Sequence, residues 1–206
     1  GKTTLLADWA RRGRTKPAWL TIGPEDNDPR LFWQAVLRAV DEAIPGLAQR
    51  AGDAFERPSS DEAAGLFVHE LEQLERPLVL VLDDFHHIVD ERLLASFAYA
   101  IENLPPSVHL VAAGRGEPAI PTSRLISRQR MTLLGTAELR FTRQEGCEFY
   151  NDAMRLGLSE EEAGERVRLT EGWIAAMRLT LPSPTDAERT ELADLSPRLE
   201  QYLLEE

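Results

Sequence analysis

Short apolar runs of the kind that form strands recur three times in the chain. They occupy residues 17–22, 77–82 and 108–113, and each is followed by glycine, proline or acidic residues that would end a strand. The run at 77–82 has no polar residues at alternate positions, which is typical of a strand buried on both faces of a parallel sheet. The pattern therefore predicts a parallel sheet that contains this run.

Longer segments between these runs have apolar residues three and four positions apart, the spacing of one helix face. Helices are predicted over residues 3–12, 30–44, 62–74 and 91–103. Residues 46–60 contain Gly, Ala and Pro without a clear period and are predicted to form a loop. Because strands and helices alternate, we expect an α/β fold in which a parallel sheet is flanked by helices.

From Gly135 onward the pattern becomes helical. A strand-like segment at 138–141 precedes predicted helices over residues 145–155, 160–170 and 173–181. Two of these helices begin with the spacing of a capping box, in Thr142 with Glu145 and in Ser159 with Glu162. We expect residues 137–181 to form a small all-α lid domain, and residues 182–206 to form a linker and the start of a further helical element.

The overall charge and the cysteine content limit the possible partners. The net charge of −12 argues against a nucleic-acid grip by this segment, because such binding depends on Lys and Arg. The longest apolar run has five residues, 78–82, whereas a membrane-spanning helix needs about 18. The single cysteine, Cys147, cannot form an internal disulfide and is predicted to be a half-buried helix residue. A cytoplasmic location with no membrane partner is therefore expected.

The first four residues, Gly1-Lys2-Thr3-Thr4, match the end of a phosphate-binding P-loop, and a predicted helix follows at once. In such loops the lysine reaches the phosphoryl oxygens and a Ser/Thr hydroxyl holds Mg²⁺, so Lys2 and Thr3 would have these roles. Gly1 and Thr4 would complete the phosphate-binding turn. Since the upstream glycines of the motif are not in the sequence, we expect the chain to begin within the loop. Residues 1–136 are accordingly interpreted as a P-loop ATPase domain.

A second signal for nucleotide binding is the pair Asp83-Asp84, which directly follows the run at 77–82. Ligands of open α/β sheets bind at the carboxyl edge of the strands, where these carboxylates would lie. Asp83 would hold Mg²⁺, and Asp84 would orient or deprotonate the attacking water. The pair alone could equally be an Asp-rich turn, but together with Gly1-Lys2-Thr3 it favours a nucleotide site.

Arg115 follows the third apolar run, in Ala112-Ala113-Gly114-Arg115. If the strand at 108–113 neighbours the strand before Asp83, the guanidinium would emerge at the same edge of the sheet and contact the terminal phosphate. The alternative is a surface arginine in a turn.

Other charged and polar residues carry weaker signals. Arg124, Arg128 and Arg130 are interpreted as the solvated face of a helix. His86 and His87 suggest a metal site, but adjacent histidines point in different directions and no third ligand stands at a suitable spacing. We therefore interpret the two histidines as loop-packing residues.

Six motifs in order resemble one family, the signal-transduction ATPases with numerous domains, and within it the large ATP-binding LuxR-type transcriptional regulators related to the maltose regulon activator. The resemblance covers almost the whole chain. The matching residues are Gly1 to Leu5; 18–20 with 26–29 and Phe32; 80–86; 139–142 with Glu145; 169–173; and 202–206.

This resemblance implies a P-loop ATPase domain and a helical domain, followed in the family by a winged helix, a sensor region and a C-terminal helix-turn-helix that binds DNA. It implies a switch in which ADP keeps the regulator monomeric, while ATP and an inducer, acting through domains outside this sequence, promote self-association and transcription. Hydrolysis of ATP would be slow and would reset the switch. Two alternatives stay open: an ATPase or kinase whose turnover is itself the output, and a degenerate scaffold that binds no nucleotide.

The resemblance also implies site residues, and one of them departs from the family pattern. Lys2 and Thr3 correspond to the phosphate and Mg²⁺ contacts, Asp83 and Asp84 to the acidic pair, and Arg115 to the sensor. The family usually has Gly-Trp-Pro with the proline on the adenine, whereas this chain has Gly172-Trp173-Ile174. Ile174 can still supply apolar contact to adenine, and Trp173 is either part of that contact or a core anchor of the helical lid.

Overall fold

The computed structural model describes residues 1–13, 15–47 and 60–181. The chain divides into two compact units between Thr132 and Leu133. Most of the loop predicted over 46–60, the element predicted over 182–206 and the motif at 202–206 lie outside the described residues.

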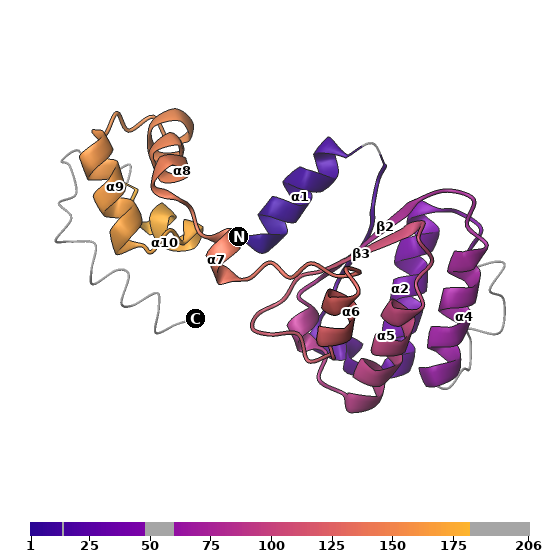
Figure 1. Cartoon of the computed structure of the whole chain (residues 1–206). Coiled ribbons are helices and arrows are strands. Elements are labelled where there is room, and N and C mark those ends of the chain that lie inside the picture. Colours follow the sequence, from indigo (N-terminus) through magenta and orange to yellow (C-terminus); the bar gives the residue numbers. More distant parts are fainter. Residues whose placement is uncertain (14, 48–59, 182–206) are drawn as a thin grey trace. The chain divides into compact units, whose positions relative to one another are not determined.

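The first unit contains a parallel sheet of three strands in the order β1-β2-β3 (Figure 1). The strands are β1 (Ala18–Thr21), β2 (Leu78–Asp83) and β3 (Val108–Ala112). Leu80 of the central strand lies opposite Ala18 on one side and Leu110 on the other. The predicted α/β fold with a parallel sheet flanked by helices is confirmed, and the apolar run at 77–82 is its central strand.

Helices and short helical turns connect the strands. They are α1 (Lys2–Arg12), η1 (Pro24–Asn27), α2 (Pro29–Ala43), α4 (Ser60–Glu72), η3 (Phe85–His87), α5 (Glu91–Glu102) and α6 (Ser123–Ser127). The starts of α2 and α5 are fixed by aspartates: the Asp28 side chain accepts from the N–H of Arg30, and the Asp90 side chain accepts from that of Leu93. Pro29 at the first position of α2 needs no hydrogen bond there.

An aromatic core holds α2, α4 and α5 side by side against one face of the sheet (Figure 1). The rings of Phe32, Trp33, Phe67 and Phe97 lie in contact, with centroid distances of 5.2 to 6.0 Å. The only polar atom of the Trp33 ring donates to Ser96 Oγ at 3.2 Å, so this buried indole is satisfied.

The opposite face of the sheet is less well covered. Because side chains alternate along a strand, Trp19, Val79 and Val111 point away from the core formed by α2, α4 and α5, and each is only half-buried, although Val81 on the same face is fully buried. A parallel sheet is normally covered on both faces. An apolar element is therefore expected to pack on this side.

The second unit is helical, as predicted. Its elements are α7 (Thr136–Leu139), α8 (Arg143–Glu148), the π-helical turn η4 (Phe149–Ala153), α9 (Glu160–Leu169) and α10 (Ile174–Leu179). Both predicted capping boxes are present: the N–H groups of Thr142 and Ser159 donate to Glu145 and Glu162, at 2.8 and 2.9 Å. The predicted helix at 145–155 changes from α to π geometry at Phe149.

The strand expected at 138–141 is wrong, because residues 136–139 form a helical turn. The Glu138 carboxylate accepts from the N–H of Gly135 at 2.8 Å, which caps the start of a turn. The N–H of Phe141 then donates to Gly172 O at 2.8 Å, so this segment is tied to the end of α9.

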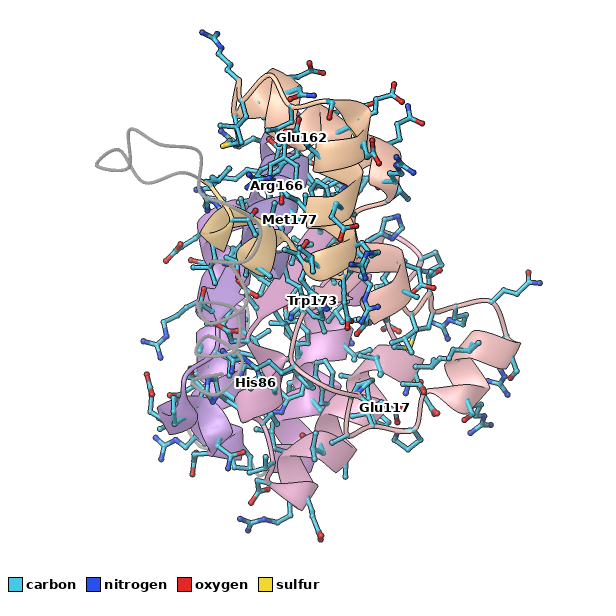
Figure 2. All side chains as sticks on the ribbon, turned by 90° about the vertical axis from the view of Figure 1, so that its left-hand side faces the viewer. His86, Glu117, Glu162, Arg166, Trp173 and Met177 are labelled. Atoms are coloured by element: carbon cyan, nitrogen blue, oxygen red, sulfur yellow. The ribbon has the colours of Figure 1, made fainter. Side chains whose placement is uncertain are left out.

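A small core joins α8, α9 and α10. It contains Tyr150, Ala163, Val167 and Met177. The Tyr150 hydroxyl and Thr180 Oγ1 form a buried hydrogen bond of 2.8 Å, and the Arg166 guanidinium donates to the Thr180 carbonyl at the end of α10. Burial raises the pKa of the Tyr150 hydroxyl. Arg166 and Met177 are labelled in Figure 2.

Candidate nucleotide site

The centre of the candidate site is Asp83, the last residue of the central strand. Its exposed fraction is 2%, because strands lie on both sides of it. Oδ1 accepts from the N–H of Asp84 at 3.1 Å, whereas no hydrogen-bond partner within the described residues reaches the buried Oδ2. A buried carboxylate oxygen without a partner is costly and uncommon. Asp83 therefore fits a site that receives a cation.

Asp84 begins the turn that leaves the sheet. Its backbone lies in the left-handed region, with φ 56° and ψ 35°, a conformation that is unfavourable for most residues but accessible to Asp. Its side chain is 46% exposed, and its Oδ1 lies 3.9 Å from Nδ1 of His86. Asp83 and Asp84 thus present one buried and one accessible carboxylate at the same edge.

The main chain before Arg115 reaches this edge from the neighbouring strand. Pairing of β2 with β3 continues past their ends, since the N–H of Ala113 donates to Leu82 O and that of Phe85 donates to Ala113 O, both at 2.8 Å. Gly114 then passes so close to the turn that a Cβ at this position would lie 3.1 Å from the backbone nitrogen of His86. The strand before Arg115 therefore neighbours the strand before Asp83, as the role of this exposed arginine requires.

The three arginines that follow do not form one solvated helix face. Only Arg124 lies within α6, which ends at Ser127. Arg130 lies beyond it and donates to the carbonyls of Glu102 and Leu104, at 2.7 and 3.1 Å. The prediction is wrong for Arg130, because its guanidinium binds the last carbonyls of the α5 region, where a cation suits the helix dipole.

The P-loop residues lie at the start of the predicted helix, now α1. Lys2 is half-buried, Gly1, Thr3 and Thr4 are exposed, and none of the residues of α1 is buried. Within the described part of the chain, neither Lys2 nor Thr3 forms a hydrogen bond or ion pair with the acidic pair. The structure brings Asp83, Asp84 and the end of β3 together. A position of Lys2 and Thr3 beside them stays a prediction.

The predicted adenine contacts belong to the helical unit. Trp173 stands at the N-cap of α10 with an exposed fraction of 45%, and Ile174 is half-buried. The alternative that Trp173 is a core anchor of this unit is therefore wrong. Gly172 fixes the preceding turn: its φ is 72°, and a Cβ there would lie 2.4 Å from Phe141 O.

The expectation that His86 and His87 point in different directions is wrong, because the short turn η3 stacks their rings with centroids 4.3 Å apart. No group of three or more His, Cys, Asp or Glu side chains that could hold a metal occurs within residues 1–13, 15–47 and 60–181. Mg²⁺ in nucleotide sites is usually held by one or two carboxylates together with substrate phosphates. A magnesium ion at Asp83 would accordingly depend on a bound nucleotide.

Sequence reasoning did not single out the contact between His86 and Asp84. The motif Asp-Asp-Phe-His at the end of the buried strand could have indicated this contact, because a tight turn after Asp84 brings His86 back towards it. The π-helical turn at Phe149 has no comparable mark in the sequence.

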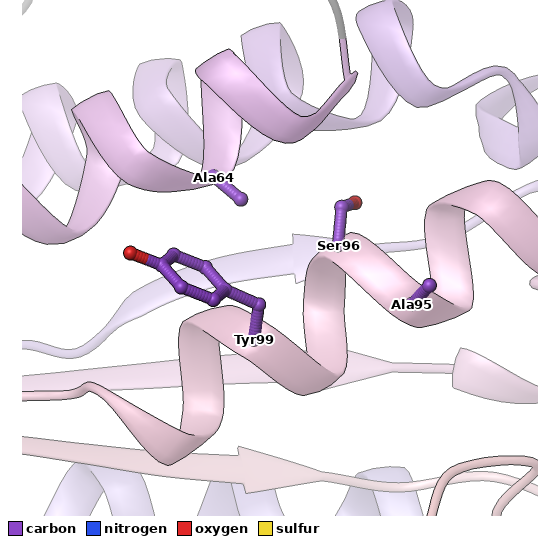
Figure 3. A pocket seen from close by; sticks show the side chains of 4 residues that line it. All are labelled: Ala64, Ala95, Ser96 and Tyr99. Carbon is purple, nitrogen blue, oxygen red and sulfur yellow. The ribbon is translucent and has the colours of Figure 1, made fainter.

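A separate pocket of about 310 Å³ lies between α4 and α5 (Figure 3). It is lined by Ala64, Ala95, Ser96 and Tyr99. None of these lining residues is charged, so the pocket does not fit a phosphate group. No helix in the described part of the chain combines the length and the apolar character needed to cross a membrane.

Comparison with known proteins links the chain to two kinds of large bacterial protein. It is 29% identical over 187 residues, or 87% of the chain, to the serine/threonine-protein kinase PknK of Mycobacterium tuberculosis. It is 28% identical over 193 residues, or 92% of the chain, to the HTH-type transcriptional regulator MalT of Vibrio cholerae, and 26% identical over 182 residues, or 87%, to MalT of Serratia proteamaculans.

The match covers only 17% of the PknK relative and 20 to 21% of the two MalT relatives. The chain therefore spans about a fifth of the length of these proteins. No protein-family model matches the chain. The resemblance indicated by the motifs is nevertheless confirmed: over most of its length, this chain is related in sequence to the MalT regulators.

Proposed function

We propose that this chain is the nucleotide-controlled switch of a MalT-related transcription regulator. ATP or ADP with Mg²⁺ binds at the carboxyl edge of the sheet, and slow hydrolysis returns the switch to its resting state. The observation that carries the proposal is the buried Oδ2 of Asp83, which has no partner within the described residues although it ends the central strand. MalT relatives over 87 to 92% of the chain support the regulatory role.

Each residue at the edge has a separate task in this proposal. Asp83 and the Thr3 hydroxyl would hold Mg²⁺, which when bound neutralises charge on the phosphate oxygens. Lys2 binds the terminal phosphates, and Gly1 and Thr4 contribute to the same phosphate-binding turn. The accessible carboxylate of Asp84 orients a water molecule, and Arg115 detects the terminal phosphate.

The connection of α1 to the sheet supports a position of Lys2 near Asp83. α1 ends at Arg12 and β1 begins at Ala18, so the helix is joined to the amino edge of the sheet by a short segment. A helix of 11 residues spans about 16 Å, and the six residues of β2 span about 20 Å. If α1 runs antiparallel to the strands, its first residue reaches the carboxyl edge.

Apolar surfaces on both elements favour this arrangement. Leu5 and Trp9 of α1 have exposed fractions of 55% and 48%, and Trp19, Val79 and Val111 are half-buried on the less covered face of the sheet. Packing α1 there would bury both surfaces, which the hydrophobic effect favours.

Regulation would depend on the helical unit closing on the nucleotide through Trp173 and Ile174. A ligand shifts a two-state equilibrium only by the difference in its affinity for the two states. A change from 1:99 to 99:1 requires a difference of about 10⁴-fold. The inducer, self-association and DNA binding would involve other domains, since the net charge of −12 disfavours DNA here.

The test measures nucleotide in the full-length protein that contains this chain. Isothermal titration with ADP and with Mg²⁺-ATP is compared for wild type, Lys2→Ala and Asp83→Asn, and bound nucleotide is extracted and identified by chromatography. We expect both variants to lose at least about tenfold in Mg²⁺-ATP affinity. Lys16→Ala and Glu42→Gln are matched controls, since both residues are exposed and lie away from the carboxyl edge.

The outcome also separates the alternatives. Many turnovers per second without inducer would favour an enzyme whose turnover is the output. If no preparation contains nucleotide and neither ADP nor ATP binds, the degenerate scaffold is correct and the switch proposal is refuted.

A further inference from the structure

His86 is held in a fixed position beside the acidic pair. It lies in the short turn η3 of the α/β unit (Figure 2). The turn is anchored by Phe85, which is 5% exposed, donates its N–H to Ala113 O and stacks on Phe97 with a centroid distance of 4.6 Å. The backbone of His86 therefore has little freedom to move away from Asp84.

The side chain of His86 is constrained as well. It is 23% exposed, and its ring stacks on that of His87 with an interplanar angle of 32°. Gly114, which follows β3, leaves room for the His86 main chain and Cβ, since a Cβ at position 114 would lie 3.1 Å from the His86 backbone nitrogen and 3.5 Å from its Cβ. The base of the side chain is therefore held close to Gly114, and the imidazole is held by its stacking on the His87 ring.

Nδ1 of this imidazole has an unused hydrogen-bonding capacity that faces Asp84. The atom is buried and has no hydrogen-bond partner within the described residues, and Asp84 Oδ1 is 3.9 Å away. That distance exceeds the range of a hydrogen bond. Hydrogen bonds in active sites often become short only when the ligand is bound, so a shift of about 1 Å would form this one.

We propose that His86 is a positioning residue for Asp84, whose carboxylate it fixes through a hydrogen bond from Nδ1–H to Oδ1 in the nucleotide-bound protein. The inference rests on the proposed function, because it assigns to Asp84 the orientation of the attacking water. The bond holds one carboxylate oxygen and leaves the other directed to the water. His86 itself does not touch the nucleotide.

The substitutions that test this proposal distinguish the two ring nitrogens. His86→Asn places an amide N–H near the position of Nδ1, whereas His86→Gln places it near Nε2. We expect His86→Ala and His86→Gln to slow ATP hydrolysis by at least about tenfold, as for residues that orient a functional group through a hydrogen bond, and His86→Asn to recover most of the rate. His69→Ala, at a histidine of α4 whose side chain is 64% exposed, is the matched control and keeps the wild-type rate.

Nucleotide affinity is measured on the same variants of the full-length protein. Affinity for Mg²⁺-ATP should change less than about twofold, because Asp84 does not hold the ligand. Equal rates for the Asn and Gln variants, or a wild-type rate for His86→Ala with binding intact, would refute the positioning role. If the wild-type protein does not bind Mg²⁺-ATP, the proposed function is refuted instead.

A measurement without turnover keeps the two proposals apart. Nitrogen NMR of ¹⁵N-histidine-labelled protein at about pH 8, where imidazole is neutral, reports which ring nitrogen carries the proton. We expect the Nδ1–H form for His86 with a non-hydrolysable ATP analogue, and its loss in Asp84→Ala, which removes the acceptor oxygen. An Nε2–H form that does not respond to Asp84→Ala, with or without the analogue, overturns the inference.

Discussion

Replacing Asp83 with Asn should stabilise the nucleotide-free protein and weaken its stabilisation by nucleotide. In the free protein, Asp83 keeps a carboxylate in a site that is 2% exposed, with Oδ2 lacking a partner among the described residues. An unsatisfied buried polar group costs about 1–3 kcal/mol, and more when it is charged. Asn has nearly the same size, is neutral, and can still accept from the N–H of Asp84.

The expected gain in the free energy of unfolding is about 1 kcal/mol, the lower end of that range because the amide is itself not fully satisfied. For a unit of this size the gain corresponds to a rise in melting temperature of about 3 °C. Saturating Mg²⁺-ATP at 100 times the dissociation constant stabilises a binding protein by about 2.7 kcal/mol. Wild type should gain this amount, whereas Asp83→Asn, whose affinity is expected to be at least about tenfold lower, should gain at most about 1.4 kcal/mol at the same nucleotide concentration.

The assay is thermal and urea unfolding of both proteins with and without Mg²⁺-ATP. The variant should be the more stable protein without nucleotide and the less stable one with it. Asp90→Asn is the control, because Asp90 caps α5 through hydrogen bonds from Arg92 and Leu93 and Asn caps a helix almost as well. If Asp83→Asn lowers the stability of the free protein and keeps the full nucleotide response, the argument from the unpaired oxygen is wrong.

Three further predictions concern other parts of the chain. Gly172→Ala should destabilise the helical unit by about 2–4 kcal/mol, since φ is 72° and the new Cβ would meet the Phe141 carbonyl oxygen. Urea unfolding measures this loss. Gly157→Ala is the control, because φ at this position is also positive but a Cβ there meets nothing within 4 Å. Hydrogen bonds from Thr142 lower the pKa of Glu145. The stabilisation by this cap is therefore fully present above the ordinary pKa of 4.5 and is lost as the pH falls through the lowered pKa. In Glu145→Gln, which keeps a neutral cap, the free energy of unfolding should depend less steeply on pH. Lys2→Ala in the full-length regulator should abolish ATP-dependent activation in a transcription assay while Lys16→Ala does not, and activation retained by Lys2→Ala would contradict the switch.

The elements that the sequence predicted well are those in which one local pattern indicates a single secondary structure and no other local pattern contradicts it. The run at 77–82 is apolar at every position after its proline and became the central strand, and the capping boxes predicted at Thr142 with Glu145 and at Ser159 with Glu162 are both present. The segment at 138–141 alternates like a strand but is short, and the capping contact between Gly135 and Glu138 favours a helical turn. A period of two over four residues is too short to outweigh a local cap.

Side-chain placement was harder to predict, because it depends on contacts between distant segments. The sequence left two roles for Trp173, a ligand contact and a core anchor, and the structure shows it exposed at the N-cap of α10. Arg130 has no local mark of its role, since its carbonyl partners are 26 and 28 residues earlier. The acidic pair was placed correctly at the edge of the sheet, but the exposure difference between Asp83 and Asp84 follows only from the strand order.

Unfavourable local features gather within four residues at one edge of the sheet. Asp84 has a left-handed backbone, and among the described residues neither the buried Oδ2 of Asp83 nor the buried Nδ1 of His86 has a hydrogen-bond partner. Natural proteins tolerate such combinations mainly at functional sites. In the helical unit such features are separate from one another: Arg155 and Glu171 have positive φ, and Arg166 Nε is buried without a partner among the described residues. The positive φ of Gly172 is occupied by the residue that suits this backbone. Substitutions at 83 and 86 should therefore trade function for stability, whereas a substitution at 172 should reduce both, and measuring the two quantities together distinguishes a ligand site from ordinary structural strain.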